Sequence, residues 1–217
     1  MDISAPWLQT TDFGILNTAV LADRKMLVLS SSPRIVPAVL DAYGGRGAVF
    51  SANAGVAATA ARLGTVAAAI VAPGVATCRA LGGADILAKL PAGQAAVVRK
   101  LLRSRGQLHP YEALGLGYRY EDTTSSGTRT ASAHSAGLVV MHYADARTAA
   151  ADLAPRRAIA TDGRSLVTNL PYREGVFTVL GAAADRGDLT LQLRPAHDQP
   201  RRLFEMFVRR DMIFAGC

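Results

Sequence analysis

Histidines and cysteines are the residues of this chain whose side chains most readily bind metal ions or transfer protons. The 217 residues include four histidines and two cysteines. None of the histidines lies in an HExxH or HxH spacing, and the sequence contains no CxxC pair. The sequence therefore assigns no catalytic residue, no cofactor-binding residue and no metal ligand. The residues concerned are His109, His134, His142, His197, Cys78 and Cys217.

One combination of residues gives a small metal-dependent enzyme as an alternative. His142 falls on an expected strand, from which it could join Glu112 and Glu205 across a sheet. Two carboxylates and one histidine are the ligand set of facial-triad metal sites in dioxygenases and isomerases. Such a site needs a convergence in space that spacing along the chain does not provide. The ordinary interpretation is a surface histidine or one held by hydrogen bonds.

Two further features are typical of loops and packing more than of catalysis. Residues 123–134 are rich in Ser and Thr but lack the GxSxG and SxxK spacings of an activated serine, which favours a long hairpin loop. Gly115 and Gly117 lie inside an expected strand and not between a strand and a helix, so they do not form a phosphate-binding loop. Glycines at such positions indicate a bulge or a close helix contact.

Tyrosines near an arginine give nucleic-acid binding as a second alternative. Tyr118 and Tyr120 share one face of an expected strand, with Arg119 on the other face and Tyr143 on a neighbouring strand. Such rings could stack on single-stranded bases, and the net charge of +7 agrees with an acidic partner. However, the arginines interleave with apolar residues at helical spacing, as on solvated helix faces. Nucleic acid is therefore the less favoured partner.

The elements that must position these residues are hairpins followed by helices. Expected strands span residues 15–21, 26–30, 65–71, 111–121, 136–143, 177–184 and 189–193. Expected helices span 33–43, 54–63, two pieces between 75 and 105, of which the second is 94–103, and 146–162.

Some element ends carry particular signals. Asp145 is placed to cap the helix that starts at Ala146, Pro155 should kink or restart that helix, and Gly163 should close it. Residues 203–212 satisfy neither the helical nor the strand period, and the pattern of 209–215 leans toward a strand.

Repeated hairpins and helices predict an α+β fold, with a largely antiparallel sheet built from strand-strand-helix units and helices on one face. Half of the residues are hydrophobic and 19% are charged, which suits a folded core. A first module is expected over residues 1–106 and a second pair of modules over 107–217. The two could form one continuous domain.

The first hairpin, residues 16–23 and 26–34 followed by an apolar helix, resembles uncharacterised bacterial envelope proteins, many of them lipoproteins. Residues 111–120, 138–146 and 164–168 are similar to C-terminal portions of such proteins in high-GC bacteria. The resemblance implies an extracytoplasmic or envelope location and carries no catalytic residues. Residues 1–6 lack the basic and apolar regions of a signal peptide, which leaves a cytoplasmic location open.

The expected function is a non-enzymatic binding or structural module of a bacterial envelope protein. It would meet another protein or envelope component through a hairpin face or the Ser/Thr-rich loop. No run of the sequence is long and apolar enough for a transmembrane span. The oligomeric state and the pairing of Cys78 with Cys217 stay open.

Overall fold

The computed structural model describes residues 7–11, 14–21, 26–30, 35–46, 52–81, 92–93, 95–96, 108–121 and 134–217. The chain divides into two compact units, Met1–Asn53 and Ala54–Cys217.

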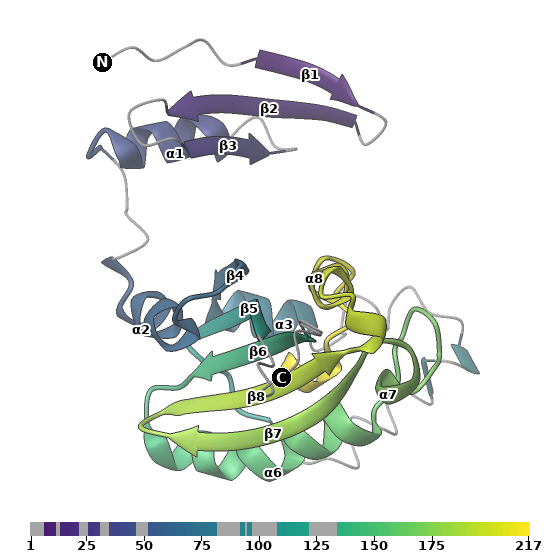
Figure 1. The fold of residues 1–217 in the computed structure, drawn as a ribbon. Helices are drawn as coiled ribbons and strands as arrows, with labels where there is room; N and C mark the ends of the chain where they lie inside the picture. Colours follow the sequence, from purple (N-terminus) through teal and green to yellow (C-terminus); the bar gives the residue numbers. More distant parts are fainter. Residues whose placement is uncertain are drawn as a thin grey trace, which may run out of the picture. The chain divides into compact units, whose positions relative to one another are not determined.

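The first unit contains a small antiparallel sheet and one helix (Figure 1). Its strands β1 (Trp7–Thr11), β2 (Gly14–Leu21) and β3 (Met26–Ser30) lie in that order, and β2 pairs with β3 from Asn17↔Ser30 to Leu21↔Met26. The helix α1 (Ile35–Tyr43) follows, and Gly45 with a φ of 75° comes just after its end. The first predicted strand-strand-helix unit is therefore confirmed.

The second unit is built on a five-stranded sheet in which every neighbouring pair is antiparallel. The strand order is β4-β5-β6-β8-β7 (Figure 1). The α+β class with a largely antiparallel sheet is thus confirmed. The strands are β4 (Ala68–Pro73), β5 (Ala113–Glu121), β6 (His134–His142), β7 (Phe177–Asp185) and β8 (Asp188–Pro195).

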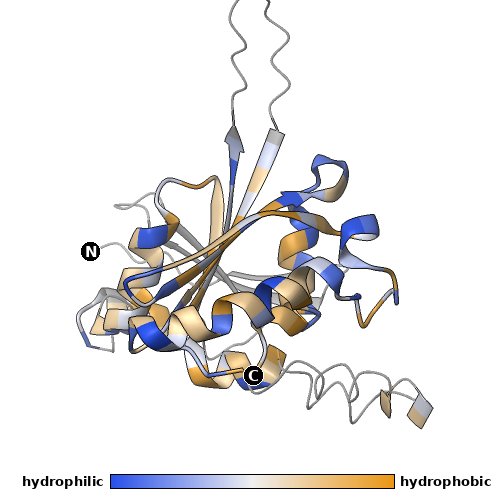
Figure 2. Ribbon diagram, turned by 90° about the horizontal axis from the view of Figure 1, so that it is seen from below, coloured by the Kyte–Doolittle hydropathy of each residue, from blue (hydrophilic) through white to orange (hydrophobic). Residues whose placement is uncertain are grey.

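Along the chain, the helices of this unit lie before, between and after the strands. They carry both hydrophobic and hydrophilic residues along their length (Figure 2). Two of them, α6 and α8, come after the hairpins β5–β6 and β7–β8, so the predicted order of strand, strand and helix recurs in this unit. The helical segments are α2 (Ala54–Leu63), α3 (Gly74–Leu81), α6 (Ala146–Asp162), α7 (Tyr172–Gly175), η3 (Ala196–Asp198), α8 (Arg201–Val208) and η4 (Ile213–Ala215).

One face of this sheet holds the main hydrophobic core. Strand residues such as Leu116, Val139 and Leu191 are fully buried on it, in one cluster with Ile159 of α6 and Leu203 of α8. Burying so many aliphatic and aromatic side chains is the main force that holds helices and sheet together.

The opposite face of the sheet is covered by α2, which differs from the prediction that the helices share one face. Gly115 and Gly117 of β5 point at this helix, and a Cβ added to Gly115 would lie 2.6 Å from Cγ2 of Thr59. The close helix contact predicted for these glycines is therefore confirmed. Small residues on β5 let α2 approach a face that its own alanine-rich sequence could not otherwise fill.

The C-terminal segment differs from the sequence-based prediction. Residues 209–215 do not form a strand: α8 ends at Val208, and a short η4 follows. Residues 211–216 are all buried, without the alternation of a half-buried strand. The helical spacing of Leu203 and Met206, both buried, was the correct signal for α8.

Two other predictions concern α6 and the module boundary. α6 runs through Pro155 as one helix, so it does not restart there, while Asp145 and Gly163 cap it as predicted. β4 and β5 are neighbours in one sheet, so the sheet includes residues on both sides of the expected boundary at 106 and 107. Most of the expected helix 94–103 and nearly all of the Ser/Thr-rich loop lie outside the described residues.

Candidate functional site

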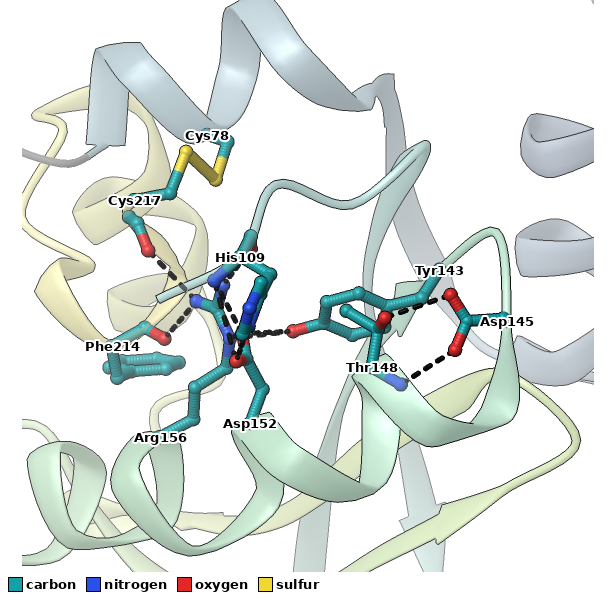
Figure 3. A network of polar contacts seen from close by, with 10 residues as sticks. Cys78, His109, Tyr143, Asp145, Thr148, Asp152, Arg156, Phe214 and Cys217 are labelled. Atoms are coloured by element: carbon teal, nitrogen blue, oxygen red, sulfur yellow. Dashed lines mark hydrogen bonds and ion pairs between the residues drawn. A yellow bond between two sulfur atoms is a disulfide. The ribbon is translucent and has the colours of Figure 1, made fainter. Parts of the chain in front are cut away.

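Arg156 on α6 is the centre of the largest buried polar network among the described residues (Figure 3). Its side chain has no exposed surface, and its Nη1 donates to the carbonyl oxygens of Phe214 at 2.8 Å and Gly216 at 2.9 Å. Nη2 donates to the carbonyl oxygen of His109 at 2.7 Å. A single cation therefore joins α6 to two distant segments of the backbone.

Asp152 balances the charge of this arginine. It lies one helical turn before Arg156, and its Oδ2 accepts from Arg156 Nε at 2.9 Å and from the Tyr143 hydroxyl at 3.0 Å. It also accepts from the backbone N–H of His109, and its Oδ1 lies 2.6 Å from His109 Nδ1. Burial raises the pKa of Tyr143, so its hydroxyl stays protonated and can donate.

The contacts of this network are those of a structural anchor. Arg156 binds main-chain oxygens, and Tyr111 donates its hydroxyl to the carbonyl oxygen of Ala215 at 2.7 Å. Burial raises the pKa of Tyr111 as well, which keeps it a donor. His109 is half-exposed but bound by Asp152 through both its backbone and its ring. The network therefore fixes residues 214–216 beside α6, and no spacing in the sequence indicates it.

A disulfide between Cys78 and Cys217 ties the same segment to α3 (Figure 3). The backbone N–H of Cys217 also donates to the carbonyl oxygen of Cys78 at 3.2 Å. The sequence alone left this pairing open, and the structure answers the question by bringing the two Cα atoms to 5.3 Å.

His142 lies on the α2 face of the sheet and is hydrogen-bonded. Its Nδ1 lies 2.7 Å from Asp188 Oδ1, and its Nε2 lies 3.9 Å from Glu112 Oε2. Arg62 of α2 comes within 3.9 Å of Asp188. The histidine and Glu112 of the expected metal site are therefore close together, but the third residue is missing from this cluster.

Glu205, the third residue of the expected metal site, is on α8 at the other face of the sheet. A Cβ on Gly137 of β6 would touch Leu203 of α8, and His142 is five positions further along the same strand. Because side chains alternate along a strand, an odd separation puts the two on opposite faces. The predicted set of His142, Glu112 and Glu205 does not come together, because His142 and α8 lie on opposite faces of the sheet.

The other histidines form no site in the described part of the chain. His197 is exposed in η3, with a φ of 56°, and the side chain of His134 lies outside the described residues. Among the residues that the structure describes, no group of three or more His, Cys, Asp or Glu side chains could hold a metal ion. None of the described helices is long and apolar enough to cross a membrane.

Three aromatic rings form a continuous surface where β5 meets α8. Tyr118 contacts Tyr120 edge to face with ring centroids 5.6 Å apart, and it contacts Phe204 of α8 in the same way at 5.6 Å. A hydrogen bond with Tyr120 is the main cause of a raised pKa at Tyr118. Tyr120 is 58% exposed. Tyr143, the third tyrosine of the predicted stacking surface, belongs instead to the buried network.

This aromatic surface borders an open hollow of about 430 Å³. The hollow is lined on one side by Tyr118 and Tyr120 and on the other by Phe204, Pro200 and Arg201 of the α8 region. The hollow could therefore take a flat or apolar group of a ligand, with Arg201 of the protein as a cation at its edge.

A second hollow, of about 240 Å³, lies on the other side of α8. Arg201 lines both hollows, and Arg202 and Arg209 line the second together with Ser165 and Thr168. We use the name α8 surface for Tyr118, Tyr120, Arg201, Arg202, Phe204, Glu205, Val208 and Arg209.

Sequence reasoning found two of these aromatic residues and missed the third. Tyr118 and Tyr120 were identified by their alternation on one strand, but Phe204 was left without a role. Phe204 and Val208, four positions apart, reach the surface only because α8 is a helix. The helical spacing of arginines among apolar residues predicts solvated helix faces. In the structure, Arg201, Arg202 and Arg209 of the α8 region line the second hollow.

Comparison with known proteins gives this chain no relative from which a role could be transferred. No family model, no curated protein and no solved structure matches it.

Proposed function

We propose that this chain is a non-enzymatic binding module of a bacterial envelope protein, and that it meets another envelope component through the α8 surface. The observation that carries the proposal is the aromatic surface of Tyr120, Tyr118 and Phe204 beside an open hollow. The hairpin β5–β6 supplies two of the three rings, and α8 supplies the third.

Exposure of these rings supports a binding role. A tyrosine that is 58% exposed keeps most of its apolar area in water, although the neighbouring Leu114 and Leu116 on the same strand are buried. Aromatic residues are enriched at binding surfaces because they offer a large contact area with few rotatable bonds. Arg201 beside the rings adds a charge that an acidic partner would neutralise.

The disulfide supports the envelope location. Such bonds persist in oxidising compartments, including the bacterial periplasm and the cell surface, and are rare in the reducing cytosol. A pair of cysteines that the fold brings into bonding distance is what a protein of the envelope would use to hold its segments together.

Co-sedimentation of the purified chain with a bacterial envelope fraction, containing both wall and membrane, tests the proposal. Tyr120→Ala should weaken binding by about two- to twelvefold, since an aromatic contact contributes about 0.5–1.5 kcal/mol. Leu180→Ala is the matched control, because Leu180 is 48% exposed on β7 and lies outside the α8 surface. Equal binding of Tyr120→Ala and the unmodified chain would contradict the proposal.

A further inference from the structure

The outward side of α8 carries an exposed aliphatic residue between charged ones. Val208 is 74% exposed, the largest exposed fraction of any large hydrophobic side chain in the described residues. It follows Arg201 by seven positions and Glu205 by three, so these residues form one stripe along the helix. Arg201 of this stripe lines both hollows, and Glu205 lines the second one.

A second exposed aliphatic residue lies across the second hollow, which we call the basic hollow because Arg201, Arg202 and Arg209 line it. Val167 is 51% exposed and lines this hollow opposite α8. Leu170, in the same turn, is 48% exposed. Two separate segments of the chain therefore present aliphatic side chains to solvent around one group of arginines.

The charge around this hollow is positive on balance. Arg201, Arg202 and Arg209 contribute three cations, and Glu205 is the exposed anion among the lining residues. Asp211 is 3% exposed, and its carboxylate accepts from the Ser165 hydroxyl at 2.6 Å and from a backbone N–H. The buried carboxylate is thus held within the protein. Arg202 donates to the carbonyl oxygen of Gly175 and to Gln199 Oε1, while Arg201 and Arg209 are exposed beside the hollow.

We infer that the α8 surface binds the surface of an anionic lipid bilayer, an inference that rests on the proposed function and names its envelope partner. Lipid phosphates would lie against Arg201 and Arg209, with Arg202 adding positive charge beside them, while Val208 and Val167 would enter the edge of the acyl region. Tyr120 has the amphipathic ring that is typical of the headgroup level. Exposed aliphatic residues distinguish this surface from one for single-stranded nucleic acid, which uses stacking and phosphate contacts.

The packing of α8 sets the depth of this contact. Leu203 and Met206 are buried in the protein core, so the helix keeps its apolar side against the sheet while it binds. Only the outward stripe and the rims of the two hollows can touch the bilayer. Binding is therefore shallow. Because it relies on attraction between arginines and lipid phosphates, it also depends strongly on salt.

Vesicle co-sedimentation of the full chain tests this inference, with phosphatidylcholine alone compared to a mixture containing phosphatidylglycerol. The unmodified chain should bind the anionic vesicles and lose that binding in high salt. Arg209→Glu should reduce binding at least fivefold, since it removes one cation near the surface and adds an anion. Arg157→Glu, the same change at an exposed position of α6, should have a much smaller effect.

Two neutral substitutions separate the aliphatic contribution from the electrostatic one. Val208→Asn should reduce vesicle binding, and Val75→Asn, at a side chain that is 49% exposed on α3, should not. Glu205→Gln should increase binding, a gain that a merely structural role would not produce. Melting curves of each variant establish that the fold is retained.

The possible outcomes separate this inference from the function on which it rests. Binding to the envelope fraction without binding to anionic vesicles would overturn the lipid assignment and leave the binding module intact. If the chain bound neither the envelope fraction nor the anionic vesicles, both the lipid assignment and the proposed binding module would be overturned. Displacement from vesicles by a single-stranded oligonucleotide, with tighter binding to the oligonucleotide than to lipid, would replace lipid by nucleic acid as the partner.

Discussion

Asp145 performs the clearest single-residue task in the chain. Its Oδ1 accepts from the backbone N–H of Thr148 at 2.7 Å, and its Oδ2 accepts from the Thr148 hydroxyl at 2.8 Å. These bonds hold the pKa of Asp145 below its ordinary value of 3.8, and the bond from the backbone N–H has the larger effect. The carboxylate is therefore favoured in the folded state, and it stabilises the start of α6.

The lowered pKa predicts how stability should depend on pH. A carboxyl group whose pKa falls on folding stabilises the protein above the unfolded value, and this contribution is lost as pH falls through the folded pKa. Asp145→Ala should therefore lower the melting temperature near neutral pH and have little effect in strong acid. Thermal melts across this range, monitored by circular dichroism, measure the difference.

Asp145→Asn provides the control for this prediction. An asparagine side chain caps helices about as well as aspartate but does not titrate in this range. The variant should stay close to the unmodified chain near neutral pH and should lack its extra loss of stability in acid. A loss at neutral pH as large as that of Asp145→Ala would show that the negative charge, and not the hydrogen bond, is what stabilises α6.

At the scale of elements, Arg156 joins α6 to the C-terminal segment at Phe214 and Gly216. Replacing it by methionine would remove its bonds to Phe214, Gly216 and His109 and would leave Asp152 buried without its cation. Breaking a buried ion pair in this way costs about 3–5 kcal/mol. Arg156→Met should therefore lower the free energy of unfolding by about that amount in urea denaturation.

Two further variants test the reason for this loss. The double variant Asp152→Asn with Arg156→Met should be less destabilised than Arg156→Met alone, since no unpaired carboxylate is buried. Arg157→Met, at the exposed neighbour on α6, should change stability little. If Arg156→Met proved as stable as the unmodified chain, the buried network would have no anchoring role.

At the scale of the whole molecule, the disulfide joins residues that are 139 positions apart. A covalent link across so long a segment restricts the unfolded chain strongly, and native disulfides commonly contribute about 2–4 kcal/mol. Reducing agent should therefore lower the denaturation midpoint of the chain. The double variant Cys78→Ala with Cys217→Ala should start from the lower midpoint and should not respond to the reducing agent.

Hydrogen bonds limit the expected effect of reduction. Arg156 and Tyr111 hold the carbonyl oxygens of residues 214–216 independently of the sulfur atoms. The reduced protein should accordingly remain folded at room temperature, with the backbone circular dichroism of the oxidised form. Complete unfolding on reduction would mean that the buried network does not hold this segment by itself.

The sequence by itself determined the local features of this protein. The expected strands 15–21 and 26–30 lie in one pair of antiparallel neighbours, and the expected strands 177–184 and 189–193 lie in another. In the second hairpin the turn needs positive φ at Arg186 and Gly187, with values of 51° and 90°, a local preference that a few residues can express. The cap at Asp145 and the end of α6 at Gly163 are local in the same sense.

Only the tertiary structure decided which residues meet, because that depends on strand order and strand parity. Parity separates Glu205 from His142, and α2 covers the face opposite α6 and α8. Arg156 finds its partners at residues 109, 214 and 216, which no spacing near α6 could indicate. The aromatic surface of Tyr120, Tyr118 and Phe204 exists because α8 packs beside β5, a contact between residues far apart in the chain.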